Sequence, residues 1–455
     1  MRNTVLATAI AAVLTLGAAN ASAQTRGAVT KAEIETMQAQ MQALVERMNR
    51  LEAANTELKA QNSELQELAD RRAAEMDYLK VQTKELREEG AVASNEISKV
   101  KGADWATKIK GRGDFRFRNE NIWQERVVGS GTEDAATRER MRIRARLGFD
   151  FKATDNITGT LLFATGGDDP RSANQTLGSG GTRKTIGLDI AYADWRFMQG
   201  GNLALGKMPF PIFRPGQSLF YDNDYNAEGG ALKFERGMFF ATGYGWWLTE
   251  GFNADPDNDA NHDSRVIGMQ AGLKFPLLGG DTVLAANYFE CGLCQDHSPL
   301  YNNNGNGNTT YRVGNSPTNL LQYGYDIVEL SAQSTIPVGD QPLALWANYA
   351  QNMADGVEYD TAYAIGAKYG RASNAKTWEL GVLYQSLDKD ALFGQWVDSN
   401  FGDGRTDTEG WMVRAAYAPV RNFTIDARYF MNTLNKDVGV ELDYDRLMID
   451  LNYKF

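Results

Sequence analysis

The chain has 455 residues, a formal charge of −11 and a mean hydropathy of −0.44. The negative charge gives no support for nucleic-acid binding, and the low hydropathy does not exclude a β-barrel, because polar and apolar residues alternate along barrel strands and cancel in the average. Only two histidines occur, so we expect no enzymatic activity, no cofactor and no metal centre.

Residues 1–23 are predicted to form a secretory signal peptide. Arg2 supplies the positive charge, residues 5–19 are apolar, and Ala21-Ser22-Ala23 is a small-residue cleavage site. The alternative is an uncleaved membrane anchor, but the apolar stretch is short for one. Residues 24–33 are then a short N-terminal segment of an exported protein.

Residues 34–89 are predicted to form a coiled coil, because apolar residues recur at alternating spacings of three and four. Its length would be roughly 80 Å at 1.5 Å per residue. Asn55 and Asn62 at successive a positions favour a dimer, and the alternative is a solvated single helix. The a positions are Ile34, Met41, Met48, Asn55, Asn62, Ala69, Met76 and Thr83, and the d positions are Met37, Leu44, Leu51, Leu58, Leu65, Arg72, Leu79 and Leu86.

A linker is expected at 90–103, after which the apolar residues recur at every second position up to the C-terminus. Sixteen strands of the length that crosses a bilayer can be placed between residues 104 and 455. The sequence therefore predicts an all-β, closed, antiparallel transmembrane barrel of about sixteen strands, preceded by an α-helical coiled coil. The strand centres lie near Ile109, Arg144, Leu161, Ile190, Leu205, Leu232, Tyr244, Met269, Ala285, Leu330, Trp346, Ile365, Leu380, Val413, Ala427 and Leu451.

The connections between these strands alternate between short and long. Short turns on one side and longer loops on the other are typical of an outer-membrane barrel, and a soluble sandwich, the alternative, has no reason to separate its loops in this way. The short turns are expected at 153–156, 199–201, 236–237, 276–281, 337–341, 371–374 and 419–422.

Basic residues follow one face of the first two strands, with apolar residues on the other face. An arginine that faces lipid at the bilayer midplane costs roughly 2–4 kcal/mol, so these residues should line a water-filled lumen. The alternative is the solvated edge of a soluble sheet. The predicted basic wall consists of Lys110, Arg112, Arg116, Arg118, Arg138, Arg140, Arg142, Arg144 and Arg146, together with Arg414 and Arg428 from strands close to the closing strand.

The loop after Lys207 carries three carboxylates, Asp222, Asp224 and Glu228. If it folds into the lumen, these groups would face the basic wall and form a constriction with a strong transverse field. An ordinary external loop is the alternative.

Cys291 and Cys294 form a C-x-x-C pair that predicts a local disulfide, with zinc binding through His297 as the alternative. Asp255, Asp257 and Asp259 alternate as calcium ligands do, but the closing glutamate of an EF-hand is missing, so a hydrated loop is favoured. His262 beside Asp263 is the only pair that suggests catalysis, and we expect none.

The last strand alternates without a break. Leu447, Ile449, Leu451, Tyr453 and Phe455 share one face, and the polypeptide ends on that aromatic residue. Such an alternating end is typical of the closing strand of an outer-membrane barrel.

The chain from about 104 to 455 resembles the trimeric outer-membrane porins, most closely the bacterial "putative porin" group. The segments that carry the resemblance are 109–118, 138–148, 169–172, 174–176, 191–195, 206–208 and 222–229. An N-terminal coiled coil also occurs in phosphate-selective porins. The resemblance implies a sixteen-stranded homotrimer that passes small solutes, whereas the asparagines at the a positions favour a dimer.

The function expected from these features is passive diffusion of small hydrophilic solutes and ions through the outer membrane of a Gram-negative bacterium, with the coiled coil in the periplasm. The expected partners are outer-membrane lipid and lipopolysaccharide, further copies of the chain, and the barrel-assembly machinery. A phosphate- or oxyanion-selective porin and a barrel-anchored coiled-coil tether or adhesin are the alternatives.

Overall fold

The computed structural model describes residues 31–99, 107–216, 218–250 and 263–455. The chain divides into two units, Met1–Lys101 and Gly102–Phe455, and each is described by itself. The predicted signal peptide, the calcium candidates Asp255, Asp257 and Asp259, and His262 lie outside the described residues.

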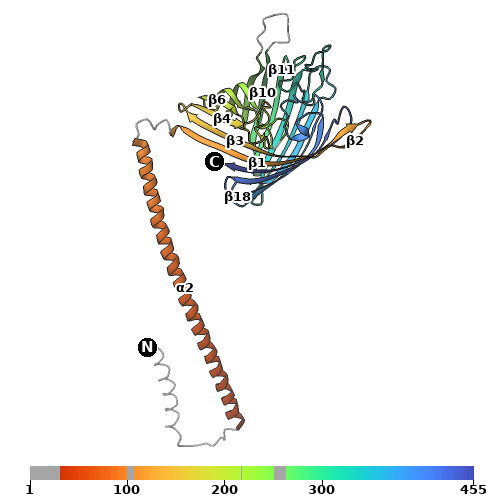
Figure 1. Cartoon of the computed structure of the whole chain (residues 1–455). Coiled ribbons are helices and arrows are strands. Elements are labelled where there is room, and N and C mark those ends of the chain that lie inside the picture. The colour runs from red at the N-terminus through yellow and green to blue at the C-terminus, as the bar shows by residue number, and fades with distance from the viewer. Residues whose placement is uncertain (1–30, 100–106, 217, 251–262) are drawn as a thin grey trace, which may run out of the picture. The chain divides into compact units, whose positions relative to one another are not determined.

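The described part of the first unit is a long helix, α2 (Lys31–Lys99), labelled in Figure 1. The helix predicted over 34–89 lies within it. The helix continues through Gly90, however, so most of the segment expected to be a linker is helical. One glycine costs about 1 kcal/mol relative to alanine in a helix, which good helix formers on both sides can absorb.

The d-position leucines of α2 are exposed in the single chain. Association of this face with another helix therefore stays a prediction. Leu44, Leu51, Leu58, Leu65, Leu79 and Leu86 are 51–68% exposed. No described helix has both the length and the apolar character needed to cross a membrane.

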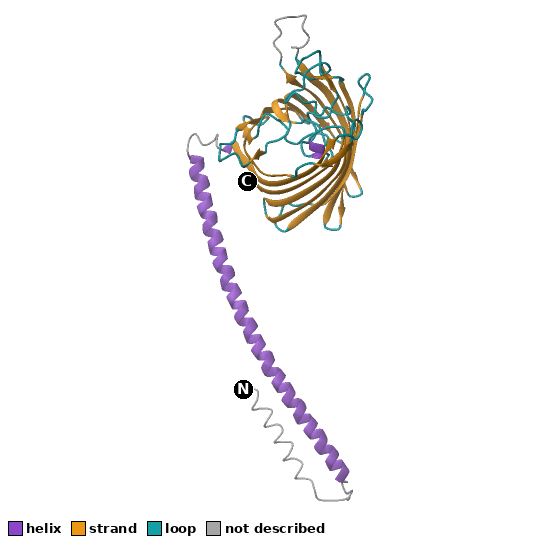
Figure 2. Cartoon of the chain, turned by 45° about the vertical axis from the view of Figure 1, so that its right-hand side comes forward, coloured by secondary structure: helices purple, strands orange, loops and turns teal. Residues whose placement is uncertain are grey.

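The second unit is the predicted closed antiparallel barrel of sixteen strands. Each strand pairs with the next along the chain, and β1 also pairs with β20, which closes the ring (Figure 2). The strands are β1 (Ile109–Val128), β3 (Arg138–Lys152), β4 (Ile157–Thr165), β6 (Ile186–Met198), β7 (Gly201–Pro209), β8 (Asn226–Arg236), β9 (Phe239–Thr249), β10 (Ser264–Leu277), β11 (Gly280–Gly292), β14 (Tyr325–Val338), β15 (Gln341–Asn352), β16 (Thr361–Gly370), β17 (Thr377–Leu387), β18 (Thr408–Val420), β19 (Phe423–Leu434) and β20 (Leu442–Lys454).

Every predicted strand centre falls within one of these strands, although Ile109 is the first residue of β1 rather than its middle. The remaining elements are short and belong to the long connections. They are β2 (Gly131–Asp134), β5 (Gln175–Thr176), β12 (Thr310–Tyr311), β13 (Leu320–Leu321) and the 3-10 helix η2 (Phe401–Asp403).

The seven predicted short turns each join two consecutive barrel strands. Gly200 and Gly237 show why some of them can be so tight, because both have left-handed backbones with φ of 76° and 60°. A side chain at Gly200 would also collide with the carbonyl oxygen of Glu235. The connections on the other side are longer and include 166–185, 210–225, 293–324 and 388–407.

Loop segments lie within the ring of strands (Figure 2), and loops 210–225 and 388–407 are among those that fold inward. Phe210 and Trp396 come from loops 210–225 and 388–407, and they join one buried cluster with Trp246 of β9, Tyr325 of β14 and Phe430 of β19. Since these strands lie far apart around the ring, their side chains can meet only inside the barrel. The interior is therefore partly filled, and the filling determines where water can pass.

Candidate functional site

The basic residues of β1 and β3 lie on the same face of the sheet. Arg116 is directly opposite Arg144 in the strand register, and Arg118 is opposite Arg142. Arg138, Arg140 and Arg146 continue the β3 row, with Lys110 and Arg112 on β1, and Arg414 opposite Arg428 on β18 and β19.

Carboxylates interrupt this row, so the continuous basic wall that the sequence predicted is a row of mixed charge. Arg118 donates two hydrogen bonds to Asp450, at 2.6 and 2.8 Å. The guanidinium of Arg144 lies 2.8 Å from Asp114, and Glu120 forms an ion pair with Arg140. Along their strands these carboxylates occupy the same every-second-residue positions as the arginines, and this spacing could have identified them from the sequence.

Asp426 interrupts the basic residues on the neighbouring strands. It forms ion pairs with Arg414 (2.5 Å) and with Arg428 (2.8 Å). The extent to which the cations still meet water therefore varies. The side chain of Arg112 is 45% exposed, whereas that of Arg118 is only 2% exposed.

Asp224 brings loop 210–225 to this row. Its Oδ1 lies 3.3 Å from Nη1 of Arg144 and 3.5 Å from Nη1 of Arg146. Asp222 points elsewhere: it accepts hydrogen bonds from the backbone N–H groups of Asp224 and Ser399, both at 2.8 Å. Asp222 therefore joins the two inward loops, and Asp224 is the carboxylate that meets the arginines.

Glu228 does not join the other two carboxylates. It lies on β8, not in the loop, and pairs with Lys207 of β7 at 2.6 Å. Its neighbour Ala227 is buried in the interior cluster, so the alternation of the strand directs Glu228 to the outer face. The prediction that all three carboxylates belong to the inward loop is therefore wrong for Glu228, because β8 begins two residues before it.

The two aspartates also differ electrostatically. Burial and the nearby Asp398 and Asp224 raise the pKa of the Asp222 carboxyl well above its usual value. Burial alone would raise the pKa of Asp224 too, but Arg144, Arg116 and Arg146 outweigh burial and hold that pKa below its usual value. Asp222 therefore keeps its proton to a higher pH than Asp224, which is the permanent anion of the loop.

Glutamines on several strands fix the inward course of loop 210–225. The backbone N–H groups of Phe213, Gly216 and Leu219 donate to the side-chain oxygens of Gln270 (2.7 Å), Gln333 (2.6 Å) and Gln385 (3.2 Å). These glutamines come from β10, β14 and β17. The loop thus runs along the inner wall across half of the sheet, and no short-range sequence pattern predicted this course.

Arg171 holds the second inward loop. Its Nη1 lies 3.2 Å from the carbonyl oxygen of Gly394 and 2.7 Å from that of Gly404, and its guanidinium lies 5.4 Å from the centre of the Tyr301 ring. The loop itself packs through Trp396, whose ring lies 4.9 Å from that of Phe393. Sequence reasoning missed this loop, although its apolar residues among polar ones are a signal.

A cavity of about 360 Å³ remains between the charged row and loop 210–225. Its lining combines charged groups of both signs with apolar side chains such as Leu162 and Ile190. Its charged and amide lining residues are Arg112, Asp114, Arg146, Asp189, Asn223, Asn226 and Lys454.

The two cysteines lie at the loop end of β11. Cys291 and Cys294 are bonded to each other and belong to the buried interior cluster. The ring of His297 bonds to the carbonyl oxygen of Gln295 at 3.2 Å. Within the described part of the chain, no three His, Cys, Asp or Glu side chains gather as a metal site would require.

A family model described as "Putative porin" matches residues 124–290 and 313–455, well over half of the chain. Among solved structures, the chain is similar to the high-pH structure of OprB from Pseudomonas putida, with 12% identity, a TM-score of 0.50, and coverage of 77% of this chain and 95% of that one. No curated protein matches the chain.

Two further solved structures are similar at lower scores. OmpF of Salmonella typhi in complex with daunomycin has 13% identity and a TM-score of 0.43, with 76% of this chain and 97% of that one covered. OpdQ of Pseudomonas aeruginosa has 14% identity and a TM-score of 0.42, with 77% and 98% covered.

Proposed function

Because the chain belongs to the putative porin family, we propose that it is a passive diffusion channel of the outer membrane for small hydrophilic solutes and ions, and not an enzyme. The observation that carries the proposal is the cavity, lined by charges of both signs, between the charged row of β1, β3 and β20 and the inward loop 210–225. A barrel packed for stability alone would bury apolar side chains at this place, not Arg112, Asp114 and Arg146.

The proposed conducting path runs along that row, and loop 210–225 forms its constriction. Asp224 on the loop and Arg146 on the wall lie 3.5 Å apart and carry opposite charges. Paired groups of opposite sign that border an aqueous path create a local field, which favours hydrated and dipolar solutes over apolar ones.

A weak preference for anions is the proposed selectivity. The row contains more cations than carboxylates, but its most buried arginines are already paired, as Arg118 is with Asp450. A phosphate-specific site would need several such guanidiniums free to bind the oxyanion directly. The field should therefore come from the partly exposed cations, chiefly Arg112, Arg146 and Arg428, whose side chains are 45%, 24% and 27% exposed.

We also propose that the protein is a homotrimer of a Gram-negative outer membrane, with α2 in the periplasm and its leucine stripe joining the copies. The outward residues of the barrel support the membrane placement, since Leu232, Leu330 and Ile365 are 51–61% exposed and apolar, as contact with lipid requires. Outer-membrane lipid, lipopolysaccharide and the barrel-assembly machinery are then its expected partners.

The experiment is a planar-bilayer recording of reversal potential under a salt gradient. Replacing Arg112 and Arg146 together by serine should shift the wild-type value towards cations, because two of the three main exposed cations are removed. The shift should shrink at 1 M salt, where the Debye length is about 3 Å. Arg126→Ser is the matched control, since Arg126 pairs with Glu133 in the β1–β2 hairpin.

Absence of any conductance from the purified wild-type barrel would refute the channel function. Conductance with an unchanged reversal potential in the double variant would instead refute only the proposed path along the row.

A further inference from the structure

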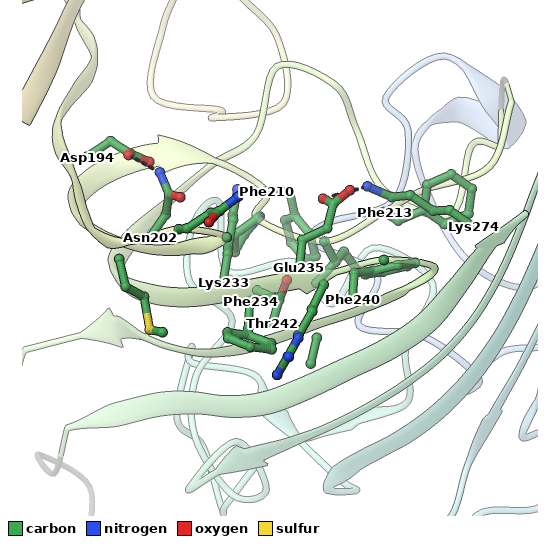
Figure 3. Close-up of a pocket in the computed structure, with 18 residues that line it drawn as sticks. Asp194, Asn202, Phe210, Phe213, Lys233, Phe234, Glu235, Phe240, Thr242 and Lys274 are labelled. Carbon is green, nitrogen blue, oxygen red and sulfur yellow. Dashed lines mark hydrogen bonds and ion pairs between the residues drawn. The ribbon is translucent and has the colours of Figure 1, made fainter. Parts of the chain in front are cut away.

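A second and larger cavity, of about 970 Å³, lies at the short-turn end of β6 to β10 (Figure 3). We call it the short-turn vestibule. Its walls come from the inner faces of these strands and from loop residues 210–213. The charged row of β1 and β3 contributes nothing to its lining, so its chemistry is separate from that of the proposed constriction.

One wall of the vestibule is an aromatic surface, and hydrogen bonds hold the backbone of one of its residues in place. The ring of Phe213 from the loop meets that of Phe240 from β9 edge to face, with centroids 6.5 Å apart. The buried Gln270 fixes Phe213 from both sides, accepting from its N–H at 2.7 Å and donating to its carbonyl at 2.9 Å. Such a surface is prepared for a flat apolar group, because binding would not have to order it.

The adjoining wall carries Lys233, a cation whose charge is not compensated. Lys233 of β8 lies between Asn202 of β7 and Thr242 of β9 in the strand register. In the part of the chain that the structure describes, Lys233 has no ion pair or hydrogen bond, whereas Lys274 across the vestibule is paired with Glu235 at 2.8 Å (Figure 3). Lys233 is therefore available for a ligand's negative group.

The surrounding carboxylates limit the charge that such a ligand can carry. Glu235 remains beside Lys274, and Asp194 accepts from Asn202 at 2.6 Å. A second negative charge on the ligand would meet these two carboxylates and be repelled. Adjacent strands are about 4.7–4.9 Å apart, so Lys233 on β8 and the aromatic wall that begins on β9 lie within the span of one small molecule.

From these features we propose that the short-turn vestibule binds small amphipathic monoanions, with a carboxylate at Lys233 and a compact aromatic or apolar body against Phe213 and Phe240. The proposal rests on the proposed channel function, because it names the class of solute that this barrel would retain on its way through.

The test uses the full-length protein in planar bilayers with benzoate as the probe. Benzoate should reduce the potassium chloride current at lower concentration than acetate, which lacks the ring, or benzyl alcohol, which lacks the charge. Lys233→Gln should raise the half-blocking concentration of benzoate about three- to fivefold, the range expected for one partly exposed ion pair. Phe213→Leu should weaken the blocking by benzoate more than the blocking by acetate.

Arg371→Gln is the matched control, since Arg371 is an exposed cation in the turn between β16 and β17, outside the vestibule. Its benzoate response should equal that of the wild type. Equal blocking by benzoate and acetate, or an unchanged benzoate response in Lys233→Gln, would overturn the proposal.

Saturation-transfer NMR of benzoate with the detergent-solubilised protein separates this proposal from the channel function. If the protein shows no conductance but transfers saturation to benzoate, and Lys233→Gln reduces that transfer, the subsite is supported and the channel function is refuted. Conductance without transfer to benzoate would refute the subsite alone.

Discussion

Arg112 and Arg118 lie on the same face of β1, but their surroundings give them different roles. Arg118 is almost fully buried against Asp450 of β20 and lies 3.2 Å from the amide oxygen of Asn400 in the second inward loop. Arg112 has nearly half of its side chain in contact with water, 3.0 Å from Asp150. The first arginine therefore stabilises the seam of the barrel, and the second contributes to the field along the proposed path.

Replacing Arg118 by methionine should destabilise the barrel strongly. The buried Asp450 carboxylate would lose both hydrogen bonds from Arg118 and keep only the longer contact with Arg116, at 3.5 Å, and breaking such a buried pair costs up to about 3–5 kcal/mol. The double variant Arg118→Met with Asp450→Leu should recover most of this loss, because both charges are removed. Urea unfolding of the refolded barrel in micelles measures both effects.

Arg112→Met is the control for this experiment and should change the free energy of unfolding by less than about 1 kcal/mol, as expected for an exposed pair. A double variant no more stable than Arg118→Met would show that the contact at the seam is not the source of the loss.

Asp224 and Glu228 offer a comparison between the two faces of the sheet. Asp224→Asn should shift the reversal potential towards anions, because a negative group opposite Arg144 and Arg146 loses its charge. Glu228→Gln should leave the potential unchanged, since Glu228 faces outward beside Lys207. The same bilayer recording measures both, and an equal shift in the two variants would place Glu228 on the conducting path.

The arginine row could be predicted because it is a local pattern: a charge at every second position shows from the sequence alone which face it occupies. The role of Arg171 could not be predicted from the sequence in this way. Its distant partners include the carbonyl groups of Gly394 and Gly404, 223 and 233 residues away, and no side-chain type marks a carbonyl acceptor. The periodicity of a sequence does not identify residues whose function depends on distant backbone groups.

The same distinction holds for whole elements. The sixteen strands and their short turns follow from alternation and turn residues, both of which act within about ten residues. The inward course of loop 210–225 depends on Gln270, Gln333 and Gln385, which lie on three separate strands. Its position is a property of the closed barrel, so the sequence supported an inward and an outward loop equally.

The exposed stripe of α2 leads to a prediction about association. In a parallel arrangement of copies, Arg47 would face Glu52 and Glu75 would face Lys80 of the neighbouring helix, which are pairs of opposite charge beside the stripe. Leu51→Asp together with Leu58→Asp should weaken association of the copies, because charges would enter the apolar seam. Sedimentation of the full-length protein and of residues 31–99 measures it.

A charge exchange tests the orientation of the helices. Glu75→Lys should weaken association, and adding Lys80→Glu should restore it if the helices are parallel, whereas Glu57→Lys, away from the seam, should have no effect. A monomeric wild-type segment would contradict the seam as an independent source of association.

At the scale of the whole molecule, the last residue completes the ring. The N–H of Phe455 donates to the carbonyl oxygen of Gly113, and the N–H of Gly113 donates back to the carbonyl oxygen of Phe455, both at 3.0 Å. A side chain at Gly113 would collide with the Phe455 ring. The Phe455 ring and Gly113 therefore fit together as one closure.

Deleting Phe455, or changing it to aspartate, should reduce the amount of membrane-embedded barrel, and Gly113→Val should do the same by displacing the ring. The yield of heat-modifiable barrel in outer-membrane fractions measures this. Val313→Asp, an exposed position in a long loop, is the control and should assemble as the wild type does. Normal yields from all three closure variants would remove the role assigned to Phe455.

The seam between β1 and β20 also determines how late in folding the barrel can close. Asp450 is separated from Arg118 by 332 residues, so almost the whole barrel must be synthesised before β1 can find its second neighbour. Until then one edge of β1 has open backbone groups, which can pair with any extended chain nearby. The interval before the last strand pairs with the first is therefore the vulnerable period of this protein, and a scarce chaperone should reduce its yield without any change in its sequence.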